Sequence, residues 1–472
     1  MTNQQGAIGE IFGSTNPLRI TLKLTETVRR SDYIETFHED KYFVFKVNRL
    51  YEDKKGAFAE LICIGEPPQT PFSFSCIFKF SQQNRIENSL GIKNDPWQSL
   101  SLGKLYKTNI EVYLPLKNFG RIFITGKSGS GKSYTVGVLI EEMLRRRIPI
   151  VIIDRHGEYV SLKVKDKNNP PLLFKAPEPG VSSQKTSRDS TNDLRNSDFP
   201  SDSTSDNLKQ EDLDLEYSLP DIPESEQEKQ DLDSNIDNFT EKTQNSEITN
   251  ASSFGAPPNP EVEKAMVDGW DEIYGFSKMI IEFADLKINK SADLGIDILL
   301  KADPSILIDF GQCSIVNLAG CEIDYQESVV SKLLNKFYYA AVRRDIPPFF
   351  LFIDEAHVFA GKKETECVKM IILFAQEGRK FGANIVIITQ KPQLLDTTIR
   401  SQAGTWIIHK LTDVNDIKLT ISSSEGLSTE NVDDISGLAP GQAIITGVAA
   451  SLTPIFINIR KRYTVHGGRA II

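Results

Sequence analysis

Residues 126–133 read GKSGSGKS, which is a complete GxxxxGKS phosphate-binding loop. The apolar run RIFIT at 121–125 precedes it and predicts a short buried strand, and residues 134–147 follow with apolar side chains at helical spacing. In a strand–loop–helix unit of this kind, glycines let the backbone amides point at phosphate oxygens. Strands alternate with helices from residue 116 onward, which predicts an α/β core. The phosphate-binding loop predicts that this core binds a nucleoside triphosphate.

The chemistry of this loop assigns a task to its last two residues. Lys132 is expected to reach the β- and γ-phosphates, and the Ser133 hydroxyl is expected to bind magnesium. The predicted cofactors are therefore ATP and Mg²⁺. The expected nucleotide-binding residues are Gly126, Lys127, Ser128, Gly129, Ser130, Gly131, Lys132, Ser133 and Tyr134.

A second apolar run, PFFLFI at 348–353, ends in two carboxylates. At the tip of a buried strand downstream of a phosphate loop, Asp354 is expected to hold the magnesium-bound water. Glu355 is expected to polarise the attacking water as general base. Residues 354–357 also spell DEAH, the box of another helicase superfamily, but the other motifs of that superfamily do not follow in order, so we interpret the match as coincidental.

Two more strand ends carry polar side chains, where open α/β sheets place their ligands. The strand at 383–389 ends at Gln390, which is expected either to sense the γ-phosphate and position the water or to be an ordinary loop residue. Asp154 closes the strand at 150–153 and is expected to orient the magnesium shell or a basic partner, although many strands simply end in aspartate.

Basic residues near the ends of predicted helices leave alternatives open. Arg379 and Lys380 follow the helix expected at 366–376, where cations suit the helix dipole, and where an arginine can also reach the nucleotide of a neighbouring subunit. Lys362 and Lys363 are interpreted either as solvated loop charges or as contacts to nucleic-acid phosphates.

Charge and composition divide the chain. Its net charge is −10, but residues 181–260 hold 18 acidic against 6 basic side chains, so the remainder is at +2. Polar residues dominate 176–262 and apolar periodicity is lost there, which predicts a disordered acidic insert that is either an interaction segment or a neutral expansion. The near-neutral remainder does not exclude a nucleic-acid partner.

The other segments predict a multidomain protein. Alternating runs in residues 1–115 predict a small antiparallel sheet or β-barrel, and 116–175 with 263–460 form the ATPase core. The runs at 441–446 and 455–459 are expected to extend the sheet or to form an edge hairpin before a basic tail at 461–472. The absence of a signal sequence or an apolar stretch of membrane-spanning length, together with five unpaired-looking cysteines, predicts a cytoplasmic protein without a membrane partner.

Several motifs in one order resemble the HerA family of hexameric DNA translocases, within the HerA/FtsK clan of RecA-like ATPases. The matching stretches outside the phosphate loop are IGEIFGS at 8–14, DRHGEY at 154–159 with Arg155 where the family commonly has proline, IDEAHVFA at 353–360, EGRKFG at 377–382, TQKP at 389–392 and HGG at 466–468.

This resemblance implies a six-membered ring with nucleotide at the subunit interfaces and double-stranded DNA in its channel. It implies that Lys132, Ser133, Asp154, Glu355 and Gln390 act in cis, while Arg379, or Lys380, acts in trans. Arg121 is also expected near the interface. A NurA-type nuclease partner in DNA end processing is implied by resemblance alone, and the acidic insert is longer than the family pattern.

Three functions are consistent with these residues. The first is an ATP-driven DNA translocase or helicase, the second an ATP-switched assembly or docking module without processive movement, and the third a secretion- or conjugation-type motor. A complete hydrolysis set with Glu355 and Arg379 favours turnover, but it does not distinguish a motor from a switch.

Overall fold

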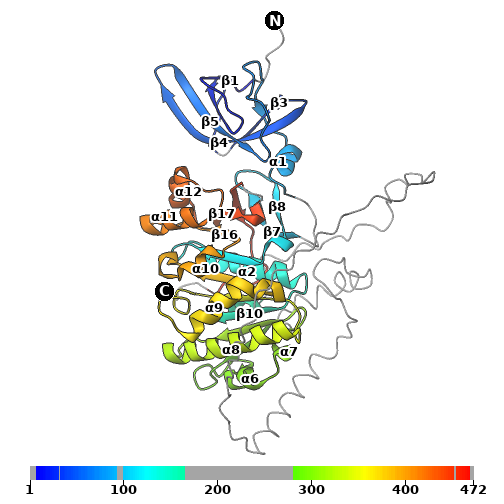
Figure 1. Ribbon diagram of the computed structural model, residues 1–472, viewed down its shortest axis with the longest axis vertical. Helices are drawn as coiled ribbons and strands as arrows, with labels where there is room; N and C mark the ends of the chain where they lie inside the picture. The colour runs from blue at the N-terminus through cyan, green and yellow to red at the C-terminus, as the bar shows by residue number, and fades with distance from the viewer. Residues whose placement is uncertain (1–6, 31, 93–98, 165–279, 451–452, 468–472) are drawn as a thin grey trace, which may run out of the picture. The chain divides into compact units, whose positions relative to one another are not determined.

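The computed structural model places two β-sheets (Figure 1). It describes residues 7–30, 32–92, 99–164, 280–450 and 453–467. The acidic insert expected at 176–262 lies outside the described residues.

The N-terminal sheet has six antiparallel strands. Their order is β1 (Gly9–Ile11), β2 (Arg19–Leu24), β5 (Gly56–Ile64), β4 (Lys41–Asp53), β3 (Tyr33–His38) and β6 (Lys79–Phe80). The N–H of Ile8 donates to the Phe78 carbonyl at 2.9 Å, next to the two edge strands. Since β1 and β6 do not pair with each other in the described sheet, its curvature is that of a half-barrel, and α1 (Gln83–Ser89) follows it.

One run predicted as a strand is mostly irregular. The alternation FSFSCIFKF at 72–80 predicts a full strand, but only its last two residues form β6. The Cys76 N–H donates to the Ser73 carbonyl at 3.0 Å, a local turn that diverts the backbone from the sheet. Phe72 and Phe78 are still buried in the core of this sheet, which accounts for the apolar pattern.

The larger sheet has twelve strands and holds the predicted core. Its order is β12 (Leu294–Gly295), β11 (Ile280–Ala284), β13 (Cys313–Asn317), β10 (Ile150–Asp154), β14 (Phe349–Ile353), β15 (Ala383–Thr389), β9 (Arg121–Thr125), β16 (Thr405–Ile408), β17 (Gln442–Gly447), β18 (Ile455–Ile459), β7 (Ser99–Leu105) and β8 (Glu111–Pro115). In this order, each strand from β12 through β16 is parallel to its neighbour, including β9, β10 and β11. From β16 onward the pairs β16–β17, β17–β18, β18–β7 and β7–β8 are antiparallel. The core is therefore a mixed α/β sheet.

Alternate residues of each strand face different helices. On β9, Ile122 and Ile124 join the cluster that includes Leu139 of α2, whereas Phe123 joins the cluster of α8 and α9. These helices are α2 (Lys132–Leu144), α8 (Ile323–Arg343) and α9 (Glu366–Glu377), and Figure 1 shows them beside the sheet. Each fully buried side chain of this size contributes about 1.5–3 kcal/mol relative to exposure.

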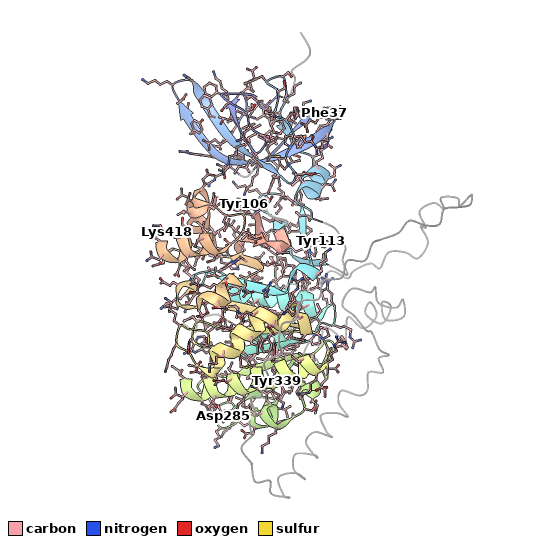
Figure 2. The ribbon with its side chains drawn as sticks, viewed as in Figure 1. Phe37, Tyr106, Tyr113, Asp285, Tyr339 and Lys418 are labelled. Atoms are coloured by element: carbon pink, nitrogen blue, oxygen red, sulfur yellow. The ribbon has the colours of Figure 1, made fainter. Side chains whose placement is uncertain are left out.

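Shorter elements complete the core. The helices are α6 (Ile296–Lys301), α7 (Pro304–Leu307), α10 (Thr397–Ser401), α11 (Val414–Ser423) and α12 (Val432–Gly437), and the 3₁₀ turns are η1 (Leu116–Asn118), η2 (Tyr159–Lys163), η4 (Gly378–Phe381), η5 (Pro392–Leu394), η6 (Thr429–Asn431) and η7 (Val448–Ala450). Among the described helices, none combines the length and the apolar character needed to cross a membrane. Phe37 on β3 and Tyr339 on α8 are large side chains that remain about half exposed (Figure 2).

The last strands and the first strands of the core meet in one sheet. β17 and β18 extend the sheet rather than ending it as an edge hairpin, because β7 pairs with β18. β7 and β8 precede the expected domain boundary at residue 115, yet they belong to the twelve-stranded sheet. Period-two alternation identifies a strand but carries no information about which sheet receives it.

Candidate functional site

The phosphate loop joins β9 to α2 with backbone angles that favour glycine. Gly131, directly before α2, has φ 109°, and Gly126, directly after β9, has φ 157°. The Lys127 N–H donates to the Lys410 carbonyl at 2.8 Å, which ties the loop to the segment after β16. This hydrogen bond holds the loop against the segment after β16. The N-terminus of α2 stays available to bind an anion.

Lys132 lies inside this loop. Its side chain is buried, and its Nζ donates to the Lys127 carbonyl at 3.3 Å. Burial lowers the pKa of Lys132, while the charges of Glu355 and Asp354 act in the opposite direction. The ammonium therefore lies in the field of the predicted carboxylate pair. Ser133 follows on the first turn of α2 and is half-buried.

The strand order gathers the predicted polar residues at one edge of the sheet. β10, β14, β15 and β9 are successive neighbours and parallel, so their carboxyl ends share that edge. The polar residues at these ends are Asp154, the last residue of β10, then Asp354 and Glu355 after β14, and Gln390 after β15. The phosphate loop begins at Gly126 after β9. Thr389 is the register partner of Thr125, which places half-buried Gln390 beside the first residue of the phosphate loop.

Two buried aspartates stand on adjacent strands at this edge. The Asp354 N–H donates to the Ile153 carbonyl at 3.0 Å, and Asp354 is only 4% exposed. Burial raises the pKa of Asp354 well above its usual range, and the charges of Asp154 and Glu355 raise it further. Burial also raises the pKa of Asp154 to about 6, against four backbone hydrogen bonds that lower it. Such crowding of carboxylates is relieved by a cation.

Asp154 is also a structural residue of the following loop. Its Oδ1 accepts from the N–H groups of His156, Gly157 and Glu158 at 3.2, 2.8 and 3.2 Å, and its Oδ2 accepts from Tyr159 at 2.9 Å. These four bonds explain why a carboxylate closes this strand. A role for Asp154 toward the magnesium shell stays a prediction.

Glu355 has an unusual backbone. Its φ is 45°, in the left-handed region that costs a non-glycine residue about 1–3 kcal/mol. Burial raises the pKa of Glu355, but the His357 side chain and the Lys132 charge outweigh it, so the net pKa is lowered. An ionised carboxylate that is held at a strained backbone position suits a general base.

The predicted cations lie at the other end of the strands. Arg379 is exposed in η4, which leads into the first residue of β15, and its guanidinium donates to the Lys117 carbonyl at 3.2 Å. Arg121 opens β9 at the same edge and donates to the Gln402 side chain at 2.6 Å. A strand of five to seven residues spans roughly 17–23 Å, so neither arginine is at the phosphate loop of its own chain. Lys362, Lys363 and Lys380 are exposed.

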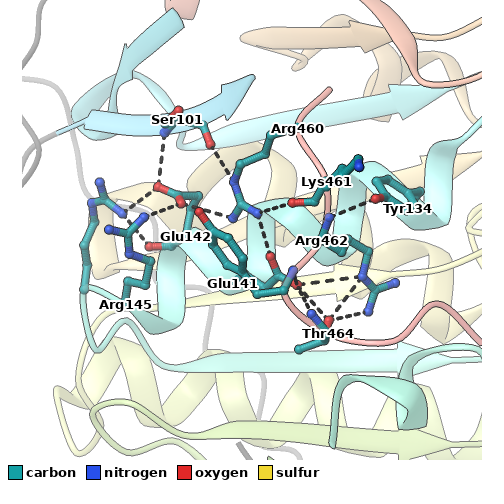
Figure 3. Close-up of polar contacts among 11 residues, drawn as sticks. Ser101, Tyr134, Glu141, Glu142, Arg145, Arg460, Lys461, Arg462 and Thr464 are labelled. Carbon is teal, nitrogen blue, oxygen red and sulfur yellow. Dashed lines mark hydrogen bonds and ion pairs between the residues drawn. The ribbon is translucent and has the colours of Figure 1, made fainter. Parts of the chain in front are cut away.

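Tyr134 contacts the C-terminal segment. Its hydroxyl accepts from the Arg462 backbone N–H at 2.8 Å (Figure 3). Its ring packs edge-on against the His466 ring, with the two ring centroids 5.4 Å apart. Contact of Tyr134 with a nucleotide stays a prediction. Within the loop, Gly129 has φ 72° and the Ser130 N–H donates to the Lys127 carbonyl at 3.2 Å. Contact of these loop residues with a nucleotide also stays a prediction.

Three residues at this edge are given no role by the sequence analysis. His409 follows β16 and is fully buried, with its Nδ1 2.8 Å from the Gln442 carbonyl and its Cβ near Gly126. His357 and Thr389 contact each other at 3.3 Å. His409 could have been found by the strand-end rule that identifies Gln390, whereas nothing in the sequence joins residue 357 to 389.

The described residues fit a magnesium ion that is completed by its substrate. Among them, no group of three or more histidine, cysteine or acidic side chains could hold a metal by itself. Mg²⁺ usually takes one or two protein oxygens together with substrate phosphates and water. Buried Asp354 and half-buried Ser133 provide such a pair.

Two family models match stretches of this sequence. Residues 100–337 match the family model described as "Helicase HerA, central domain", which covers half of the 472-residue chain. Residues 324–424 match the model of zonular occludens toxin (Zot). The VirB4 structure of Thermoanaerobacter pseudethanolicus aligns with 78% of this chain and 97% of its own at 16% identity and a TM-score of 0.40.

Two curated relatives cover most of the sequence. The protein named "Probable DNA double-strand break repair helicase HerA" of Methanocaldococcus jannaschii is 25% identical over 526 aligned residues, covering 98% of this chain and 97% of its own. The DNA double-strand break repair helicase HerA of Sulfolobus acidocaldarius is 28% identical over 382 residues, covering 76% and 69%. The family match over half of the chain, supported by a complete phosphate loop and its carboxylate edge, shows that the protein belongs to the HerA family of ATP-hydrolysing helicases.

Proposed function

We propose that the protein is an ATP-driven motor that translocates along or unwinds double-stranded DNA as a homo-oligomeric ring, probed below by DNA-stimulated hydrolysis. The observation that carries this proposal is the strand order β14-β15-β9, which sets Gln390 between the phosphate loop and Asp354–Glu355. In this position Gln390 can orient the attacking water beside the base, as turnover of ATP requires. The relatives that are named DNA repair helicases support DNA as the substrate.

Each side chain at the edge has a proposed task. Lys132 neutralises the β- and γ-phosphates, Asp354 and Ser133 hold Mg²⁺, and Gln390 orients the attacking water. Bound Mg²⁺ supplies positive charge that offsets the charge developing on the phosphate oxygens. Glu355 accepts the proton of the water, as its lowered pKa allows at neutral pH.

A ring is proposed because the two candidate arginines, Arg379 and Arg121, lie at the strand ends away from the phosphate loop of their own chain. Arg379 lies at the opposite edge of the sheet and is exposed, which supports a role in the site of a neighbouring subunit. Arg121 is engaged with Gln402 and the Ala375 carbonyl at 2.6 and 3.3 Å, so we assign it a supporting role at that edge. Three further parts of the proposal rest on the family resemblance. These are a ring of six subunits, a RecA-like ATPase core, and a NurA-type nuclease partner in DNA end processing.

Two other functions predict different behaviour. An ATP-switched docking module would hydrolyse ATP without displacing a bound obstacle, and a secretion- or conjugation-type motor would act at a membrane. The buried hydrolysis site favours neither, but the DNA-repair names of the relatives support the first proposal. A cytoplasmic location stays a prediction.

The test is ATP hydrolysis by the full chain with and without linear duplex DNA, with the assembly mass measured on the same sample. The expected result is stimulation by DNA in a ring-sized assembly, and displacement of a DNA-bound roadblock that requires ATP. Lys132→Ala is the control without nucleotide binding, and Glu355→Gln is the control that binds ATP without turnover. ATP hydrolysis by a monomer at a rate that DNA does not change would overturn the proposed motor. Stimulation by DNA without displacement of the roadblock would favour the docking module.

A further inference from the structure

A histidine connects the base to the segment that carries the sensor. His357 Nδ1 lies 3.2 Å from Glu355 Oε2 and 3.3 Å from Thr389 Oγ1. The side chains of His357 and Glu355 are 14% and 13% exposed, so water competes little for these contacts. The Ala356 N–H also donates to the Ile388 carbonyl at 2.9 Å, which holds the two loops together through the backbone.

Both partners approach the same nitrogen. An imidazole nitrogen has one position in the ring plane, so it either carries a proton and donates, or is bare and accepts. As a donor it directs its one N–H at either the Glu355 carboxylate or the Thr389 hydroxyl, and as an acceptor it receives a hydrogen bond from the Thr389 hydroxyl only. In this structure, the contact of His357 with Thr389 meets the geometry of a hydrogen bond. Its contact with Glu355 does not, so the buried Glu355 Oε2 has no hydrogen bond of good geometry. The two contacts therefore compete.

Thr389 is in turn tied to the far side of Gln390. The Lys391 N–H donates to Thr389 Oγ1 at 3.0 Å, so the hydroxyl spans the peptide units on both sides of Gln390. A shift of Gln390 toward or away from a γ-phosphate moves this hydroxyl, and with it the partner of His357. The chain of contacts runs from the proposed sensor through Thr389 and His357 to Glu355.

We propose that His357 is a positioning residue for ATP hydrolysis, which aligns the Glu355 carboxylate according to the state of the Gln390 segment reported by Thr389. This inference rests on the proposed role of Glu355 as general base. It assigns a function to His357, the last residue of the DEAH stretch, whose match to another helicase superfamily we interpret as coincidental. Because His357 is proposed to act through Glu355, its loss should affect turnover and leave nucleotide binding in place.

The first test replaces the histidine. His357→Leu removes Nδ1 and is expected to lower kcat by about 10- to 100-fold, the cost of a misplaced catalytic group. KM for ATP and binding of a fluorescent ATP analogue should stay unchanged, because only the hydrolytic step loses alignment. His357→Asn places an amide nitrogen close to the position of Nδ1, so it should recover most of the lost kcat.

The second test is a double-mutant cycle with Thr389→Val. This single variant should lower kcat less than His357→Leu does, because the ring loses its anchor but keeps Glu355. In the His357→Leu background it should have no further effect, since the contact it interrupts is already absent. Effects on kcat that multiply would mean that the two residues act independently, and would overturn the proposed connection.

The controls separate this inference from the proposed function. His38→Asn, in β3 of the other sheet, where the ring contacts Thr70 at 3.0 Å, should leave kcat unchanged. Wild-type kcat in His357→Leu, with Glu355→Gln inactive, would overturn the role of His357 and leave the base assignment intact. Turnover by Glu355→Gln would overturn the base assignment itself. A parallel loss of ATP binding, melting temperature and kcat in His357→Leu would show a structural role instead.

Discussion

Arg460 Nη1 lies 2.8 Å from Glu141 Oε2, joining the segment after the last core strand to the helix that begins in the phosphate loop. Glu141 is fully buried and also accepts from the Thr464 backbone N–H and hydroxyl at 2.9 and 2.7 Å. Arg460 reaches Glu142 as well, at 3.1 Å (Figure 3). The C-terminal segment is thus bound along α2 by charges that are shielded from water.

Breaking this pair should destabilise the core. Arg460→Ala removes the nearer of two arginines from the buried carboxylate of Glu141 and leaves Arg462 at 3.8 Å. We expect the free energy of unfolding to fall by about 1.5–3 kcal/mol, the range for losing a hydrogen bond to a charged group. Arg343→Ala is the matched control, because its partner Asp345 and Arg343 itself are 48% and 61% exposed. That control should cost less than about 1 kcal/mol. Urea unfolding measures both, and equal losses would contradict the shielding argument.

His409 predicts a pH dependence of stability. Burial lowers the pKa of His409 to about 4, from an ordinary value near 6.5. Below pH 6.5 the unfolded chain takes up a proton that the folded chain refuses, so stability is lost as the pH falls from 6.5 toward 4. This loss amounts to about 3 kcal/mol.

His409→Asn isolates this effect, since the amide does not titrate and its Nδ2 can still donate to the Gln442 carbonyl. Buried carboxylates such as Asp154 titrate in both proteins and cancel in the comparison. As the pH is lowered from 7 to 4.5, the wild-type protein should therefore lose more unfolding free energy than His409→Asn does. A constant difference across this range would mean that His409 takes up its proton at the same pH in the folded and the unfolded protein, and would contradict its lowered pKa.

Arg379 should act in a neighbouring subunit. Arg379→Ala and Glu355→Gln are each expected to abolish turnover, and loss of an arginine finger typically costs 10³–10⁵-fold. Mixed in one assembly, an intact Arg379 on one subunit faces an intact Glu355 on the next, so part of the ATPase activity should return. Mass measurement must show that mixed assemblies form, and no recovery at any mixing ratio would then count against the trans role.

The phosphate loop should not tolerate a side chain at Gly126. Its φ is 157°, and an added Cβ would lie 2.6 Å from both the His409 Cβ and the Ser130 Oγ. Gly126→Ala is therefore expected to abolish ATP binding, measured by titration with a fluorescent analogue. Gly437→Ala is the control, because it ends α12 with nothing within 4 Å of the added atom. ATP binding by Gly126→Ala at wild-type affinity would contradict the close packing of the loop.

Much of the site could be predicted because its signals are local. The phosphate loop needs glycines at set intervals, and the runs before Asp354 and Gln390 predict buried strands whose ends carry the polar residue. All three expectations correspond to observed elements, namely the β9–α2 loop, β14 and β15. The helix expected at 366–376 is α9.

The sequence by itself determined which residues end strands and which chemistry they carry, since backbone period and side-chain type are written in neighbouring positions. Only the tertiary structure decided that β15 lies between β14 and β9, that Arg379 is at the edge opposite the phosphate loop, and that His357 meets Thr389. The physical reason is that strand pairing joins segments far apart in the sequence, such as β9 with β15 and β7 with β18. The hydrogen bonds between such strands are alike for any sequence, so their order depends on how the whole core packs.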